Sequence, residues 1–170
     1  ASRLFSKESW ALLANNVPKI FDDPTNKKAR ASVQLGAAWA GIAIEHSMLG
    51  ATHSCANPLT SQFNIAHGQA VGVMLPHVVR FNTPSSLPEY SELAQIIAPS
   101  VQTSSAGEWL AEWLFALLDS SQLATHLSSL NITATDINSL ASAATREWTA
   151  SFNPRTVSSD DFFNLYEAAL

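Results

Sequence analysis

The chain has 170 residues and a mass of 18.3 kDa, which is the size of a single domain. Hydrophobic residues make up 46% and charged residues only 14%, a balance that excludes a disordered chain and suggests that more surface than usual contacts other protein. The net charge of −5 comes without any cluster of basic residues, which excludes a nucleic-acid partner. No apolar run approaches the roughly 18 residues of a membrane span, and the first residues do not form the apolar core of a signal peptide. The single cysteine, Cys55, favours a reducing, cytoplasmic location.

Helical periodicity starts almost at the first residue. Apolar side chains on one face predict a first helix from near Ser2 to Phe21. Asp23 is then expected to cap a second helix, with Pro24 at its first helical position.

The second helix should run from about 25 to 51. Residues 33–44 are apolar nearly all the way round, which predicts a helix buried on most sides. Gly36 and Gly41 lower helix propensity by about 1 kcal/mol each, so we expect close packing against a neighbouring helix at both positions.

From 52 to 66 the pattern breaks, and Asn57-Pro58 is expected to force a turn. The helices predicted after this point are 67–81 with a kink at Pro76, 87–98, 106–118, 121–130, 133–148 and a last one capped by Ser158 or Ser159. Strand signals are almost absent. The sequence therefore predicts an all-α protein, one compact multi-helix domain over residues 1–170.

Two histidines, His53 and His67, bracket the broken segment at a spacing of 14 residues. Each is expected at a helix junction, where the chain can fold back and place two imidazoles on one cation. A hydrogen-bonded core histidine is the commoner case, so the spacing alone leaves both interpretations open. The Glu-x-x-His and His-Glu-x-x-His signatures of other metal enzymes are absent, as are glycine-rich phosphate loops.

The stretch around these histidines resembles the C-terminal half of the iron-containing (group III) alcohol dehydrogenases, relatives of glycerol dehydrogenase and dehydroquinate synthase. In chain order, the residues that carry the resemblance are Leu49-Gly50, His53, His67-Gly68 after a 13-residue interval, Leu75-Pro76-His77, and Asn153-Pro154-Arg155 before the last helix. The likeness extends over nearly the whole chain.

The resemblance implies a two-domain enzyme, in which an N-terminal α/β domain binds NAD or NADP and a helical C-terminal domain of the dehydroquinate synthase type holds a divalent metal in the cleft. His53 and His67 match two of the family's four ligands. The other two, in Asp-x-x-x-His, have no match in this chain. The metal is expected to be Fe²⁺, with Zn²⁺ as the alternative.

By the same resemblance, the chain is the metal-binding C-terminal part of an enzyme that transfers hydride between a primary alcohol or aldehyde and the nicotinamide. We expect it to be inactive without its own N-terminal domain, and the whole enzyme to be a homo-oligomer such as a dimer. Two alternatives stay open: a non-catalytic helical association module with a degenerate metal site, and a metal-independent relative such as the maleylacetate reductases.

Asn57 stands where many members of the family carry another histidine, one helical turn after the first ligand. The resemblance implies a catalytic and cofactor-binding role beside the nicotinamide, where the amide can hydrogen-bond a substrate oxygen or the ribose. An amide cannot shuttle a proton at neutral pH. The alternative is that Asn57 caps the turn before Pro58.

The remaining candidates are assigned to packing. His77 is expected to be buried and hydrogen-bonded rather than to face the cleft, and Cys55 to be a small buried hydrophobe. His126 is expected on the surface of a short helix. The tryptophans expected in the core are Trp39, Trp109, Trp113 and Trp148.

Overall fold

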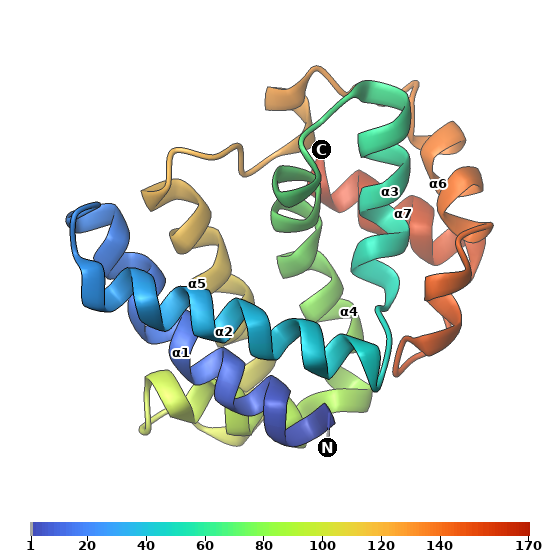
Figure 1. Ribbon diagram of the computed structural model, residues 1–170. Helices are drawn as coiled ribbons and strands as arrows, with labels where there is room; N and C mark the ends of the chain where they lie inside the picture. Colours follow the sequence, from blue (N-terminus) through green and yellow to red (C-terminus); the bar gives the residue numbers. More distant parts are fainter. Residues whose placement is uncertain (1) are drawn as a thin grey trace.

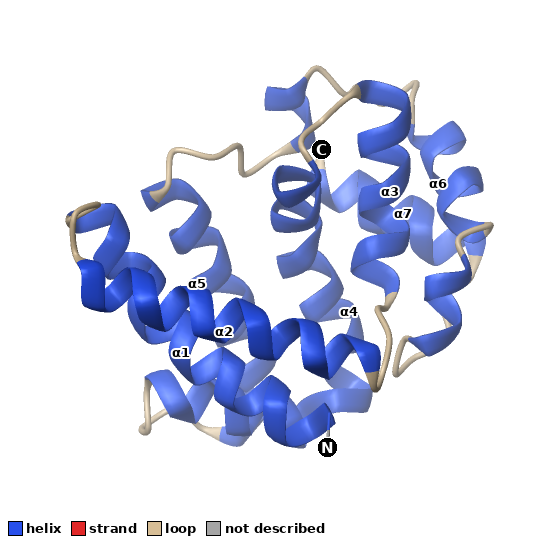
Figure 2. Cartoon of the chain, in the orientation of Figure 1, coloured by secondary structure: helices blue, strands red, loops and turns tan. Residues whose placement is uncertain are grey.

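Helix α4 (His67–Ile97) lies between two groups of helices (Figure 1). The first group is α1 (Ser2–Asp22), α2 (Lys27–Glu45) and α5 (Ala106–Ser120), and the second is α3 (Ala51–Phe63), α6 (Ile137–Thr145) and α7 (Ser159–Ala169). Three short 3₁₀ helices connect them: η1 (Thr103–Ser105), η2 (Leu127–Leu130) and η3 (Trp148–Phe152). The computed structural model describes residues 2–170, and all regular elements in this range are helical (Figure 2), which confirms the predicted all-α class.

The larger core lies where α3, α4, α6 and α7 meet. Its fully buried side chains include Leu59, Met74, Leu140, Phe162 and Tyr166. Burying one such side chain stabilises the fold by about 1.5–3 kcal/mol. This core therefore holds α3 and the first half of α4, which carry the two histidines, against a rigid support.

A smaller core joins α4 and α5 to α1. Val79 and Leu110 are buried in it, and Trp10 of α1 packs against it. The indole Nε1 of Trp10 donates a hydrogen bond to the carbonyl of Leu93 at 2.9 Å, which fastens α1 to the last turns of α4.

Small residues let α1 and α2 pack closely as a helical hairpin. A Cβ added at Gly36 would lie 3.0 Å from Cγ of Leu13, and the buried hydroxyl of Ser9 donates to the Gly36 carbonyl at 2.7 Å. The close packing predicted at Gly36 is confirmed. The same prediction for Gly41 is wrong, because a Cβ there would meet nothing within 4 Å.

Helix α2 is shorter and more exposed than its sequence predicts. Asn26, not Asp23, caps it, and it ends at Glu45, shortly before Met48 adopts a left-handed conformation (φ 76°). Packing on α1 buries only one side of the helix. The exposed side carries Leu35, Ile42 and Ile44, each at least 37% exposed.

Residues 51–63, expected to be broken, form the continuous helix α3 with Pro58 inside it. A proline in a helix interior costs about 3 kcal/mol or more, because it removes one backbone hydrogen bond and crowds the preceding turn. Pro58 is itself buried, with Cys55 and Leu59 on either side of it. The apolar burial of this segment outweighs the cost of the proline.

Two further differences concern helix ends. The loop expected at 82–86 is helical, and only Ser86 (φ −132°, ψ 17°) interrupts α4. The helix expected at 121–130 shrinks to η2, since Gln122 (φ 59°) and Asn131 (φ 62°) are left-handed. The predicted cap at Ser158 is confirmed as part of a capping box with Asp161.

Within residues 2–170, no helix combines the length and the apolar character that crossing a bilayer requires.

Candidate functional site

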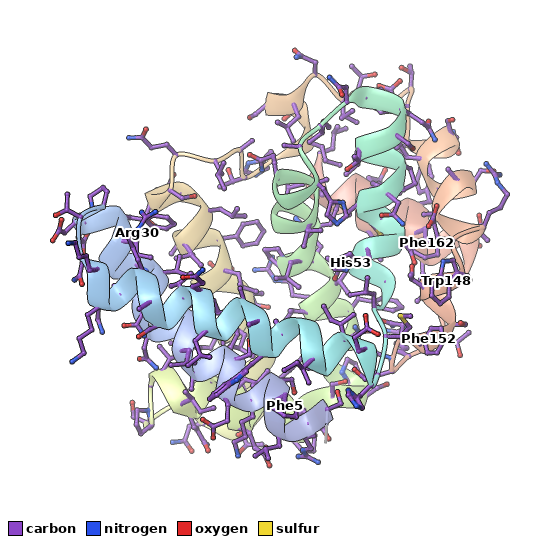
Figure 3. The ribbon with its side chains drawn as sticks, in the orientation of Figure 1. Phe5, Arg30, His53, Trp148, Phe152 and Phe162 are labelled. Atoms are coloured by element: carbon purple, nitrogen blue, oxygen red, sulfur yellow. The ribbon has the colours of Figure 1, made fainter. Side chains whose placement is uncertain are left out.

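His53, which is labelled in Figure 3, lies beside His67 where the start of α4 approaches α3. Their ring centroids are 5.3 Å apart, and the ring planes are inclined at 47°. His53 is the third residue of α3 and is partly buried, while His67 is the first residue of α4 and is exposed. The structure thus brings together the two histidines that the sequence singles out.

Their separation suits a shared cation. Two imidazoles bound to one ion at about 2.1 Å, with a near-tetrahedral angle between them, have ring centroids about 5 Å apart. Burial, and next the charge of His67, lower the pKa of His53, which keeps its ring neutral and able to bind a metal at neutral pH. No third His, Cys, Asp or Glu completes the group among residues 2–170, so this part of the chain offers two ligands.

The short connection between α3 and α4 places His67. Asn64 ends α3 in a left-handed conformation (φ 55°, ψ 29°), and its backbone nitrogen donates to the carbonyl of Thr60. The buried side chain of Ile65 anchors the connection in the larger core. Ala66 then directs the chain into α4, whose first residue is His67.

The start of α3, which carries His53, is held by a residue from the other end of the chain. The backbone nitrogen of Ala51 donates to Oδ1 of Asn153 at 3.2 Å. Gly50 permits this approach, because a Cβ there would lie 3.0 Å from the same oxygen. The Asn153-Pro154-Arg155 motif therefore supports the position of His53.

The same motif also forms hydrogen bonds with the middle of α4. The carboxamides of Asn82 and Asn153 exchange two hydrogen bonds of 3.0 and 2.7 Å. Arg155 donates to the carbonyl of Phe81 at 2.9 Å, and its guanidinium carbon lies 4.0 Å from the centroid of the Phe81 ring. One loop thus fixes α3 relative to α4.

Asn57 lies one turn after His53, so both side chains are on the same face of α3. Its Nδ2 donates to Oε2 of Glu147 at 2.7 Å. The alternative role for Asn57, capping a turn before Pro58, is wrong because the helix continues past both residues. Sequence reasoning missed Glu147, which is 90 residues away from Asn57 and belongs to no recognised motif.

Beside Glu147, η3 presents two aromatic side chains to solvent (Figure 3). Trp148 is 60% and Phe152 51% exposed, and their rings meet edge to face at 5.8 Å. The prediction that Trp148 lies in the core is therefore wrong. Between them in sequence, the buried Thr149 shares a 2.7 Å hydrogen bond with Ser54, which fixes η3 against α3.

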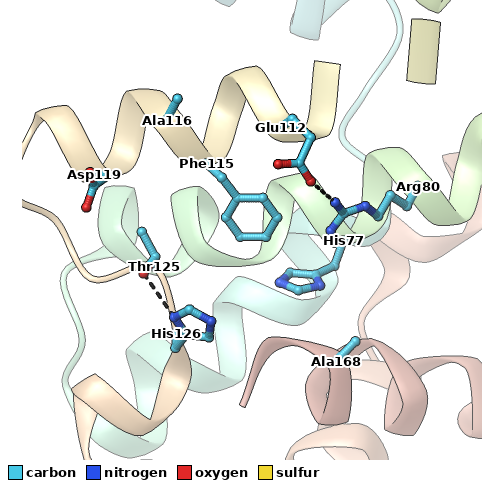
Figure 4. Close-up of a pocket in the computed structure, with 9 residues that line it drawn as sticks. All are labelled: His77, Arg80, Glu112, Phe115, Ala116, Asp119, Thr125, His126 and Ala168. Carbon is cyan, nitrogen blue, oxygen red and sulfur yellow. Dashed lines mark hydrogen bonds and ion pairs between the residues drawn. The ribbon is translucent and has the colours of Figure 1, made fainter. Parts of the chain in front are cut away.

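A second feature is a pocket of about 560 Å³ that does not include His53 or His67 (Figure 4). Residues of α4, α5, α7 and the loop before η2 line it: His77, Arg80, Glu112, Phe115, Ala116, Asp119, Thr125, His126 and Ala168. Arg80 forms ion pairs with Glu108, at 2.6 Å, and with Glu112.

His77 is the buried polar group of this pocket. Its ring stands edge-on to Phe115 at 5.3 Å, and its Nε2 finds no hydrogen-bond partner among residues 2–170. Burial, followed by the charges of Arg80 and His126, lowers the pKa of His77 to about 4. The predicted burial is confirmed, but the hydrogen bond expected for this side chain is not formed at Nε2. His126 is exposed as predicted, although it precedes η2 rather than lying on a helix.

Comparison with known proteins identifies the family of the chain. Residues 3–170 match the family model for the C-terminal part of the Fe-containing alcohol dehydrogenase family. Lactaldehyde reductase of Escherichia coli K12 is 31% identical over 147 residues, which are 85% of this chain and 38% of that enzyme. The 1,3-propanediol dehydrogenase of Citrobacter freundii is 26% identical over 93% of this chain and 42% of its own.

The fold agrees as well. The crystal structure of a 1,3-propanediol oxidoreductase superposes with a TM-score of 0.94 at 24% identity, over 99% of this chain and 45% of that one. The chain spans about two fifths of the length of the curated relatives it matches. Since the family model covers almost every residue, the chain belongs to the Fe-containing alcohol dehydrogenase family and forms its C-terminal helical domain.

Proposed function

We propose that the protein carrying this chain is a metal-dependent alcohol dehydrogenase, which transfers hydride between a small primary alcohol or its aldehyde and NAD or NADP. The observation that carries the proposal is the 5.3 Å distance between the ring centroids of His53 and His67, in a chain that belongs to this family. The named relatives, a lactaldehyde reductase and a 1,3-propanediol dehydrogenase, support a small alcohol or aldehyde as substrate.

In this proposal His53 and His67 hold the metal as neutral imidazoles. The family points to Fe²⁺, and Zn²⁺ suits the same donors. When bound, the metal supplies a Lewis acid that lowers the pKa of the alcohol hydroxyl and polarises the aldehyde carbonyl. The remaining ligands and the nicotinamide site are expected from an N-terminal domain of the same protein.

Asn57 is the third residue of the proposed site, with a catalytic and cofactor-binding role. One turn beyond His53, its carboxamide can bind a hydroxyl of the substrate or of the cofactor ribose. We further propose a homo-oligomer in the cytoplasm, as the low charge content and the single cysteine suggest.

The two alternative functions are less well supported than a metal-dependent dehydrogenase. Neither an association module with a degenerate site nor a metal-independent reductase requires two imidazoles side by side at the start of two helices. No contact in the described residues favours either candidate over the dehydrogenase.

Metal analysis and hydride transfer test the proposal on the whole protein. We expect one Fe²⁺ or Zn²⁺ per chain and oxidation of a primary alcohol with NAD⁺ or NADP⁺, both lost in His53→Ala and His67→Ala. The matched control is His46→Ala, because His46 is exposed at the end of α2 and its ring, within residues 2–170, bonds the carbonyl of Ile42 alone. Activity that survives without metal would identify a metal-independent reductase, and bound metal without any turnover would point to the association module.

A further inference from the structure

We propose that Glu147 is a positioning residue for this reaction: its carboxylate fixes the carboxamide of Asn57 so that the amide oxygen faces the bound ligand. The inference rests on the proposed function and adds a residue to its site. Glu147 acts through Asn57 and does not itself touch the reacting atoms.

The chemistry of the pair selects one orientation of the amide. An ionised carboxylate only accepts hydrogen bonds, whereas a carboxamide has one donating end and one accepting end. Nδ2 of Asn57 lies 2.7 Å from Oε2 of Glu147, a length typical of a hydrogen bond to a charged acceptor. Turning the amide over would bring two acceptor oxygens together, so Glu147 keeps Oδ1 of Asn57 directed away from itself.

The backbone around Glu147 is held by contacts to α3, the helix that carries His53 and Asn57. Two residues further on, Thr149 is buried and hydrogen-bonded to Ser54, which lies next to His53 on α3. Four residues beyond that, Asn153 binds the first turn of α3. Both contacts fix η3 to the helix that carries Asn57, and they thereby fix the position of the Glu147 carboxylate. Glu147 itself contacts neither His53 nor His67 through a hydrogen bond in the described residues.

The oriented amide defines the chemistry of what it binds. Oδ1 of Asn57 accepts no hydrogen bond from residues 2–170, so it is free to accept one from a ligand. Side chains four apart on a helix have Cβ atoms about 5–6 Å apart, which places this oxygen within one turn of His53. An acceptor at that place binds a hydroxyl group and repels a carboxylate or carbonyl oxygen. The pair therefore selects a hydroxyl-bearing ligand, either the alcohol or the cofactor ribose.

Substitutions at Glu147 in the metal-loaded whole protein test the inference. In Glu147→Ala we expect unchanged metal content and a roughly tenfold lower kcat/KM for the alcohol, the effect of losing about one hydrogen bond. Glu147→Gln should recover most of this loss, since its amide oxygen still accepts from Asn57. Asn57→Ala combined with Glu147→Ala should be no worse than Asn57→Ala alone. The control is Glu8→Ala on the exposed surface of α1.

A second readout does not depend on turnover. In protein labelled with ¹⁵N-asparagine, the side-chain NH₂ resonances of Asn57, assigned by their loss in Asn57→Ala, should shift in Glu147→Ala and stay unchanged in Glu8→Ala. Unshifted resonances would overturn the proposed pair. So would a Glu147→Ala effect that adds in full to that of Asn57→Ala, or one that accompanies metal loss. If the resonances shift while the metal-loaded protein oxidises no alcohol, the proposed function is wrong and Glu147 only orients the amide.

Discussion

Oδ1 of Asn153 accepts a hydrogen bond from the backbone nitrogen of Ala51 at 3.2 Å, across 102 residues of chain. The first backbone N–H groups of a helix have no partner within the helix, and a side chain just before it usually supplies one. The N-cap of α3 is Gly50, which has no side chain to do so. A distant asparagine replaces the missing cap, and it does so two residues before His53.

Removing this distant cap should destabilise the protein. For Asn153→Ala we expect a loss of about 1–2 kcal/mol in the free energy of unfolding, because the Ala51 nitrogen and the Asn82 carboxamide both lose partners. Urea unfolding measures the change. Asn15→Ala is the matched control, since Asn15 is exposed and bonds only within its own helix; equal losses in the two variants would contradict the capping role.

Replacing two of the glycines by alanine should change the stability of the protein in opposite directions. A Cβ at Gly107 would overlap the hydroxyl of Thr83 and lie 2.6 Å from its Cγ2, so Gly107→Ala should cost about 1–3 kcal/mol as α5 is pushed from α4. Thr83→Ala should restore part of that loss. At Gly41 the space is open, and Gly41→Ala should stabilise by up to about 1 kcal/mol through helix propensity. Thermal unfolding distinguishes the two, and a stabilising Gly107→Ala would show that the helices do not approach this closely.

The burial of His77 predicts a loss of stability in mild acid. The pKa of the His77 ring falls from 6.5 to about 4 on folding. Between pH 6.5 and 4 the ring is therefore protonated in the unfolded chain but neutral in the folded chain. Above pH 6.5 this ring does not reduce the free energy of unfolding. As the pH falls from 6.5 to 4, the free energy of unfolding decreases by about 3 kcal/mol in total. In His77→Leu the slope of unfolding free energy against pH between 4.5 and 6.5 should be smaller than in the parent.

The window chosen for that measurement separates His77 from the acidic groups. Hydrogen bonds lower the pKa values of Asp161 and Glu108. Protonation of these two carboxylates therefore destabilises the protein only below about pH 4.5. His46→Ala is the control for loss of an exposed histidine. An unchanged slope in His77→Leu would mean that the pKa of the ring does not shift on folding.

The 170-residue chain by itself should not oxidise alcohols. Residues 2–170 bring together two histidines without a third ligand, and the sequence contains no glycine-rich dinucleotide loop. Incubation with Fe²⁺ or Zn²⁺, NAD⁺ and 1-butanol, followed by absorbance of the reduced nicotinamide, measures this directly. Turnover above the rate without protein would show that the chain carries a complete site.

Local sequence signals predicted the features that depend on neighbouring residues. The His53–His67 spacing, read together with the family resemblance, predicted that the two rings lie close together, and their centroids are 5.3 Å apart. The cap of the last helix at Ser158 or Ser159 was likewise predicted from its own turn, and the structure assigns it to Ser158.

Several features decided by tertiary packing were not predicted. Pro58 signals a break, yet burial of its neighbours keeps α3 intact. The apolar stretch of α2 signals burial, yet only one of its sides meets α1. Glu147 carries no local signal at all, because its role depends on a partner 90 residues earlier in the chain.

The two histidines belong to one helical hairpin, whereas the residues that support them arrive much later in the sequence. Contacts between segments close in sequence form with little loss of chain entropy, and contacts such as that of Asn153 with Ala51 must close a loop of about 100 residues. We therefore expect the imidazoles to pair early in folding, through local contacts, and to reach their final alignment later. Substitutions in the loop from Glu147 to Arg155 should consequently affect how long the aligned site persists more than how fast the histidines first meet.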